Sequence, residues 1–123
     1  MKIRYLFALM MISSCTKSQD LTCTDFKIGT FKAEGINYKL PTTNVSRSEK
    51  TQKESADGLA TLEATIEWKS ECNYELIYVN GSPDMKGQKV SVEILKIEGQ
   101  KAICTATVEG MPGINLNFEM EKQ

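Results

Sequence analysis

The side chains that most often carry out acid–base or nucleophilic catalysis are nearly missing from this chain. It contains no histidine, the usual general base. The only Ser-x-x-Lys pattern runs from Ser14 to Lys17, and cleavage before Cys15 would divide it. Glu63 and Glu67 share one face of a predicted strand, but the alternation of polar and apolar residues turns that face toward solvent. The sequence therefore predicts no catalytic residues, and we expect that the protein is not an enzyme.

The N-terminal segment has the layout of a secretory signal peptide. Lys2 and Arg4 precede an apolar run over residues 5–12, which is shorter than the roughly 20 residues that cross a bilayer. Cys15 follows two small residues, and this pattern resembles the lipobox of bacterial lipoproteins. The resemblance implies that residues 1–14 are removed and that Cys15 is the acylated lipid attachment point. The alternative is an ordinary signal peptide with an incidental cysteine.

Acylation is the expected means of membrane attachment. The formal net charge is −1 and no polybasic run is present, so we expect neither electrostatic lipid binding nor a nucleic acid partner. One acyl chain binds weakly, and several chains, such as palmitate, would make a sufficient anchor. Residues 15–24 are predicted to hold the lipid-anchored cysteine and a polar tether, and residues 25–123 a single domain. Thr16 resembles the residue type that sorts lipoproteins to the outer membrane, which implies that location, on the periplasmic or the exterior side.

Three further cysteines remain for an exported, oxidising compartment. Cys23 and Cys72 lie beside predicted strand ends, where the geometry is adjustable, so we predict a disulfide between them. Cys104 alternates with small apolar residues and is predicted to be a buried free thiol, without a basic neighbour in sequence to activate it. Three thiols without histidine make a poor zinc site, so we expect no metal and no cofactor.

The elements that position these side chains are predicted to be strands. Polar and apolar residues alternate strictly over 114–121 and again over 62–69, which is typical of half-buried strands. Turn residues such as Asp57-Gly58 and Asn80-Gly81 separate the runs. The pattern predicts an all-β fold, an antiparallel up-and-down meander of about eight strands closed into a barrel. The expected strands cover 25–33, 36–47, 50–56, 59–69, 73–80, 88–97, 101–109 and 114–122.

Two segments depart from regular alternation. Residues 90–94 present one apolar face, after which Leu95 and Ile97 take over, and this phase slip predicts a β-bulge. Residues 46–56 are polar with no clear period. They fit a strand pair at the barrel rim, a loop, or one helical turn capped by Ser48, and we predict strand.

Several residues in order resemble a family of small bacterial lipoproteins with no established activity. The shared pattern is a cysteine, Phe-Lys-x-Gly-x-Phe (residues 26–31), Arg47, Gln52, and Trp68 followed by Cys-x-Tyr-x-Leu (residues 72–76). In addition, Gly29-Thr30-Phe31 resembles the Gly-x-Trp opening of lipocalins, which are eight-stranded barrels that bind small apolar ligands. Phe31 stands where lipocalins place tryptophan. This second resemblance implies a lipocalin-like barrel.

The candidate ligand-binding residues are the aromatic side chains on predicted inward faces, together with one arginine. They are Phe31, Arg47, Trp68, Tyr74, Tyr78 and Phe118. These aromatic rings either fill the core or line a ligand cavity, because a barrel of eight strands is wide enough for either. A buried Arg47 would need a ligand carboxylate or internal partners, for which Gln52 and Glu54 are candidates. The alternative is a solvated arginine on a rim strand.

Two classes of function follow from this sequence. The first is a lipid-anchored lipoprotein of the cell envelope that binds a small apolar ligand in its barrel. The second is a structural or adaptor lipoprotein with a filled core that binds another envelope protein.

Overall fold

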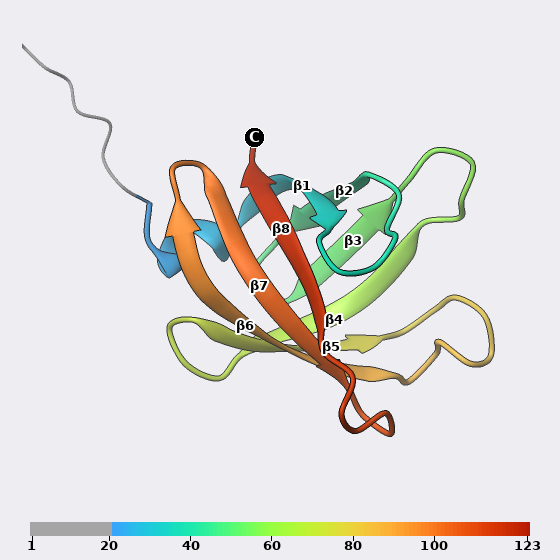
Figure 1. Ribbon diagram of the computed structural model, residues 1–123. Helices are drawn as coiled ribbons and strands as arrows, with labels where there is room; N and C mark the ends of the chain where they lie inside the picture. Colours follow the sequence, from blue (N-terminus) through green and yellow to red (C-terminus); the bar gives the residue numbers. More distant parts are fainter. Residues whose placement is uncertain (1–20) are drawn as a thin grey trace, which may run out of the picture.

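The computed structural model describes residues 21–123 as one closed antiparallel β-barrel. Each strand pairs with the next along the chain, and β8 pairs with β1 to close the barrel (Figure 1). A short 3-10 helix, η1, precedes the first strand. The elements are η1 (Cys23–Phe26), β1 (Gly29–Gly35), β2 (Thr43–Arg47), β3 (Thr51–Ser55), β4 (Leu62–Trp68), β5 (Asn73–Tyr78), β6 (Lys89–Glu98), β7 (Lys101–Val108) and β8 (Leu116–Lys122). The all-β, up-and-down, eight-stranded barrel predicted from the sequence is confirmed.

The alternation of residue types explains why these segments form a closed sheet. In β4, Ala64 and Ile66 are buried, whereas Thr65 and Glu67 are exposed. Successive side chains of a strand point to opposite faces, so one face of every strand contributes to the interior. Closing the meander pairs both edges of the sheet and leaves no free edge for association with another chain.

The two irregular segments form a strand pair and a β-bulge. The polar segment 46–56 contains the end of β2, a tight turn and β3, and the backbone N–H of Ser48 donates to the carbonyl oxygen of Thr51 at 3.0 Å. The segment is therefore a strand pair. The register between β6 and β7 shifts between Ile94 and Lys96. The bulge predicted from the phase slip is confirmed, but Leu95, which was expected to take over the apolar face, lies at the bulge with 55 % of its surface exposed, and Ile97 continues the face toward the core.

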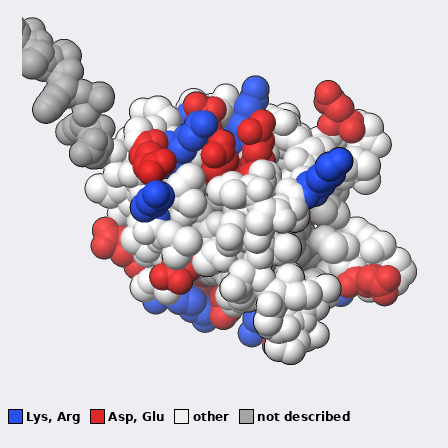
Figure 2. All heavy atoms as spheres, viewed as in Figure 1, with Lys and Arg blue, Asp and Glu red and all other residues white. Residues whose placement is uncertain are grey.

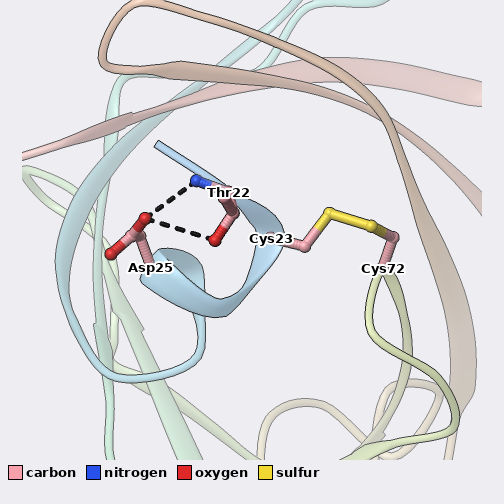
Figure 3. Close-up of a disulfide and its surroundings, with 4 residues drawn as sticks. All are labelled: Thr22, Cys23, Asp25 and Cys72. Carbon is pink, nitrogen blue, oxygen red and sulfur yellow. Dashed lines mark hydrogen bonds between the residues drawn. A yellow bond between two sulfur atoms is a disulfide. The ribbon is translucent and has the colours of Figure 1, made fainter. Parts of the chain in front are cut away.

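The first two predicted strands were placed wrongly. Residues 25–33 were expected to be one strand, but Phe26 ends η1 and β1 begins only at Gly29. The carboxylate of Asp25 accepts a hydrogen bond from the backbone N–H of Thr22 at 2.8 Å, which favours a helical turn over an extended chain (Figure 3). Gly29 then has φ +135°, a conformation that glycine readily adopts. The second strand starts at Thr43 rather than residue 36, because residues 36–42 form a loop.

A disulfide joins η1 to the loop between β4 and β5. Cys23 and Cys72 are bonded, with 49 residues of sequence separation and 5.3 Å between their Cα atoms (Figure 3). Cys104 is a buried free thiol. Both predictions for these cysteines are confirmed. Cys23, which the sequence assigned to the tether, is part of the folded domain, because η1 packs its Phe26 side chain into the core.

The two ends of the barrel differ. η1, the β4–β5 loop and the β6–β7 loop lie at one end, which we call the closed end, on the left of Figure 1. The loops β1–β2, β3–β4, β5–β6 and β7–β8 lie at the other end, which we call the open end. The chain enters the fold at the closed end, beside the disulfide.

The outer surface carries charges of both signs. Lys and Arg are interspersed with Asp and Glu on the face seen in Figure 2. Ion pairs join neighbouring strands, including Lys53 with Glu63 at 3.8 Å and Lys101 with Glu119 at 3.2 Å. Within residues 21–123, no helix has the length and apolar character needed to cross a membrane. The predicted signal peptide and the attachment point at Cys15 lie outside the described residues.

Candidate ligand-binding cavity

The open half of the barrel contains a cavity of about 490 Å³. Its walls come from inward-facing side chains of the strands, and its mouth is formed by the loops of the open end. The wall is mostly apolar and includes Ala33, Val45, Leu76, Val92, Ala106 and Phe118. The volume falls within the range of roughly 300–1,000 Å³ that is typical of small-molecule sites.

Side-chain size explains why one half of the barrel is empty and the other is full. In the closed half, Phe26 and Phe31 stack with ring centroids 5.4 Å apart, and Trp68 packs on Tyr74 at 4.6 Å. In the open half, Ala33 and Ala106 occupy inward positions and are too short to reach across the barrel. The closed half is therefore a packed plug, whereas the open half holds a cavity.

Arg47 forms the floor between the plug and the cavity. Its side chain is 4 % exposed, although it is charged. Nε donates to the side-chain oxygen of Gln52 at 2.7 Å, Nη1 donates to the carbonyl oxygen of Phe26 at 2.8 Å, and Nη2 donates to the hydroxyl of Tyr74. The guanidinium also lies 4.4 Å from the centroid of the Tyr74 ring. Arg47 thus fastens η1 to the barrel wall.

A second polar layer continues from Arg47 up the cavity wall. The amide nitrogen of Gln52 donates to Glu54 Oε2 at 2.7 Å, and the hydroxyl of Tyr78 donates to the same oxygen. Gln52 therefore connects the guanidinium of Arg47 to the carboxylate of Glu54. This relay balances the buried positive charge without direct contact between the two ions.

Burial and this carboxylate raise the pKa values of the cavity tyrosines, which are already protonated at neutral pH, and so extend the pH range in which they keep their protons. Burial raises the pKa of Tyr74 to about 12, against the opposing effect of the Arg47 charge. Burial, followed by the charge of Glu54, raises the pKa of Tyr78, and the same two causes raise the pKa of Tyr38. Each phenol therefore remains a hydrogen-bond donor.

The structure brings four of the six predicted ligand-binding residues to the cavity wall. They are Arg47, Tyr74, Tyr78 and Phe118. Phe31 and Trp68 do not line the cavity, because they lie in the closed half below Arg47, with the guanidinium carbon of Arg47 5.5 Å and 5.9 Å from their ring centroids. Both face the interior as expected. They are separated from the cavity only because they lie nearer the closed end of the barrel axis.

Sequence reasoning missed the loop residues at the mouth. Tyr38 and Leu40 from the β1–β2 loop and Met85 from the β5–β6 loop contribute to the lining. A Cβ at Gly35 would collide with the carbonyl oxygen of Tyr38, so a glycine here lets the β1–β2 loop fold back across the mouth. Asn37 holds that loop, since its Nδ2 donates to the carbonyl oxygen of Asn115 at 3.0 Å.

Sequence reasoning also missed the role of Phe26 in closing the barrel. The Thr22-x-x-Asp25 spacing directly before Phe26 is the signal that could have found it, because this spacing marks a helix start.

Within residues 21–123, no three His, Cys, Asp or Glu side chains gather closely enough to hold a metal ion. Comparison with protein-family models, with curated proteins and with solved structures found no match to this chain.

Proposed function

We propose that this protein binds a small apolar molecule in the barrel cavity while a lipid on Cys15 holds it at the outer membrane of the cell envelope. The observation that carries the binding proposal is the apolar cavity of about 490 Å³ in the open half. Apolar surface left facing such a space gains contacts when an apolar molecule enters. No catalytic step is part of this proposal.

The anchoring proposal is supported by the sequence pattern at Cys15 and by where the chain enters the fold. The first element of the fold, η1, lies at the closed end, opposite the mouth. An anchor attached there would leave the mouth free to exchange ligand. Cys15→Ala should release the protein from the membrane fraction or leave an unprocessed precursor. A variant that still fractionates with membranes as the parent does would contradict the anchor.

The binding proposal can be tested by filling the cavity. Ala106 is 5 % exposed and lines the cavity, so Ala106→Phe should place a ring where the ligand sits. Thr107, the next residue of β7, is exposed, which makes Thr107→Phe the matched control. Binding of a fluorescent apolar probe should fall at least tenfold in Ala106→Phe and stay unchanged in Thr107→Phe. Equal affinity in both variants would contradict binding inside the barrel.

One observation favours the second class of function, an adaptor that binds an envelope protein. Each loop of the open end carries an exposed apolar side chain, namely Ile36, Leu59, Val79, Met111 and Ile114. An apolar rim of this kind also suits a partner surface. Charge substitutions at Leu59 and Ile114, which lie outside the cavity lining, would weaken partner binding while leaving probe binding intact.

A further inference from the structure

We infer that the cavity selects apolar molecules whose polar end donates hydrogen bonds, an alcohol or a primary amine, over molecules that end in a carboxylate. This inference rests on the proposed binding function and specifies the ligand chemistry at the same site. The inference follows from the hydrogen bonds of the polar atoms in the cavity, because some of these atoms already have protein partners and others do not.

Glu54 supplies an open acceptor in the cavity wall. Both hydrogen bonds that its side chain accepts from other residues, from Gln52 and from Tyr78, end on Oε2. Among the residues that the structure describes, Oε1 has no hydrogen-bond partner, and Glu54 lines the cavity. A carboxylate oxygen has lone pairs and no proton to offer, so a hydroxyl or ammonium group is its natural complement.

Arg47 is the residue expected to bind an acid, but most of its N–H donors are already used by protein atoms. A guanidinium has five N–H groups, and four of those of Arg47 are directed to protein atoms. The weakest of these four contacts runs from Nη2 to the sulfur of Met120 at 3.6 Å. A carboxylate that took full bidentate contact would displace Tyr74 or Gln52. The hydroxyl proton of Tyr74 is a further donor at the floor, but it is a single neutral one.

The charged residues of the cavity also disfavour a ligand that ends in a carboxylate. Among residues 21–123, which the structure describes, the lining includes one cation, Arg47, and two carboxylates, Glu54 and Asp84, with no lysine. Arg47 and Glu54 already balance through Gln52, so an added anion would be desolvated without a counter-charge, which is costly. A protonated amine would bring a positive charge that the carboxylates of the lining can balance. An alcohol is neutral and would bring no charge to balance.

Three probes that share one alkyl chain test the head-group preference directly. Dodecanol, dodecylamine and dodecanoate are titrated at neutral pH against the full-length protein loaded with a fluorescent apolar probe. We expect the alcohol and the amine to displace the probe at concentrations at least tenfold lower than dodecanoate. The contrast between alcohol and amine shows which donor the site prefers.

Glu54→Gln keeps the size of the side chain and removes its charge. We expect amine affinity to fall about tenfold, because a hydrogen bond to a charged group is lost, whereas alcohol affinity changes little. Dodecanoate should bind more tightly than it does to the parent. Glu63→Gln is the matched control, since Glu63 lies on the neighbouring strand β4, is paired with Lys53 and is outside the cavity lining.

The outcomes separate this inference from the proposed function. Dodecanoate binding as tightly as the other two probes, or no effect of Glu54→Gln on the amine, would overturn the head-group preference while leaving apolar binding intact. Failure of all three to displace the probe, together with probe binding that Ala106→Phe leaves unchanged, would overturn both. If Glu54→Gln does not fold, the order of the three probes on the parent protein still decides the matter.

Discussion

The two halves of this barrel are built from the same eight strands but are packed in opposite ways. The closed half holds Phe26, Phe31 and Trp68, sealed by a disulfide and by Arg47. The open half holds small side chains around a cavity, with loops across the mouth. The difference teaches that the closed half supplies most of the packing that stabilises the fold, whereas the open half supplies the binding cavity. The tight packing of the closed half offsets the contacts that are missing around the cavity.

The disulfide is the largest single contribution that we expect from the closed half. Closing a loop with a sequence separation of 49 residues stabilises the fold by about 4 kcal/mol in the chain-entropy model. Replacing Cys23 and Cys72 together by serine should lower the free energy of unfolding in urea by about this amount. Affinity for an apolar probe should be little changed under folding conditions. An unchanged unfolding midpoint would mean that the bond does not constrain the chain.

A matched pair of phenylalanines tests the contrast in packing. Phe31, 1 % exposed, lies in the closed half, whereas Phe118 is half-buried at the cavity wall. Phe31→Ala should cost about 3 kcal/mol, typical of a packed core, and Phe118→Ala about 1 kcal/mol, because one side of its ring already lacks neighbours. Thermal unfolding of both variants measures the difference. Equal losses would mean that the two halves are packed alike.

Alkaline pH should lower the free energy of unfolding in two successive steps. Burial raises the pKa of Cys104 in the closed half from 9.0 to about 12, and the pKa of Tyr74 at the cavity floor from 10.0 to about 12. In each case the folded state holds its proton more tightly than the unfolded chain, so stability is complete below the unfolded pKa and falls as pH rises toward 12. Each group should lower the free energy of unfolding by up to about 1.4 kcal/mol per pH unit in this window.

The variant Cys104→Ala isolates the first of these steps. It should reduce the loss of stability between pH 9 and pH 10, where the unfolded thiol titrates before the unfolded phenol does. Urea unfolding at the two pH values measures this loss. The same slope in parent and variant would show that the thiol is not sealed from solvent.

The period-two pattern of the sequence was enough to predict the barrel, because it reports directly which side chains face inward. It located β4 to β8 within a few residues, and the slip at Leu95 located the bulge. It failed at the first strand, where the hydrogen bond between Thr22 and Asp25 favours η1 over an extended chain. Local side-chain chemistry overrode the alternation there.

The cavity could not be read from the same pattern. The alternation predicts that Trp68 and Tyr78 both point inward. It does not predict how far along the barrel axis each side chain lies. Whether Ala33 and Ala106 leave a space depends on the diameter of the closed barrel and on the side chains that face them, and both arise only from the full set of strand registers. The partners of Arg47 were partly foreseen, since Gln52 contacts it directly and Glu54 through Gln52.

The position of a bound apolar molecule tests the division between the two halves most directly. Nuclear Overhauser contacts between dodecanol and assigned methyl groups would report it in solution. We expect contacts to Leu76, Val92 and Ala106, which line the cavity, and none to Ile66 or Ile94, which are buried outside it. Contacts to Ile66 or Ile94, or contacts confined to the outer surface, would contradict a plug in the closed half and a binding site in the open half.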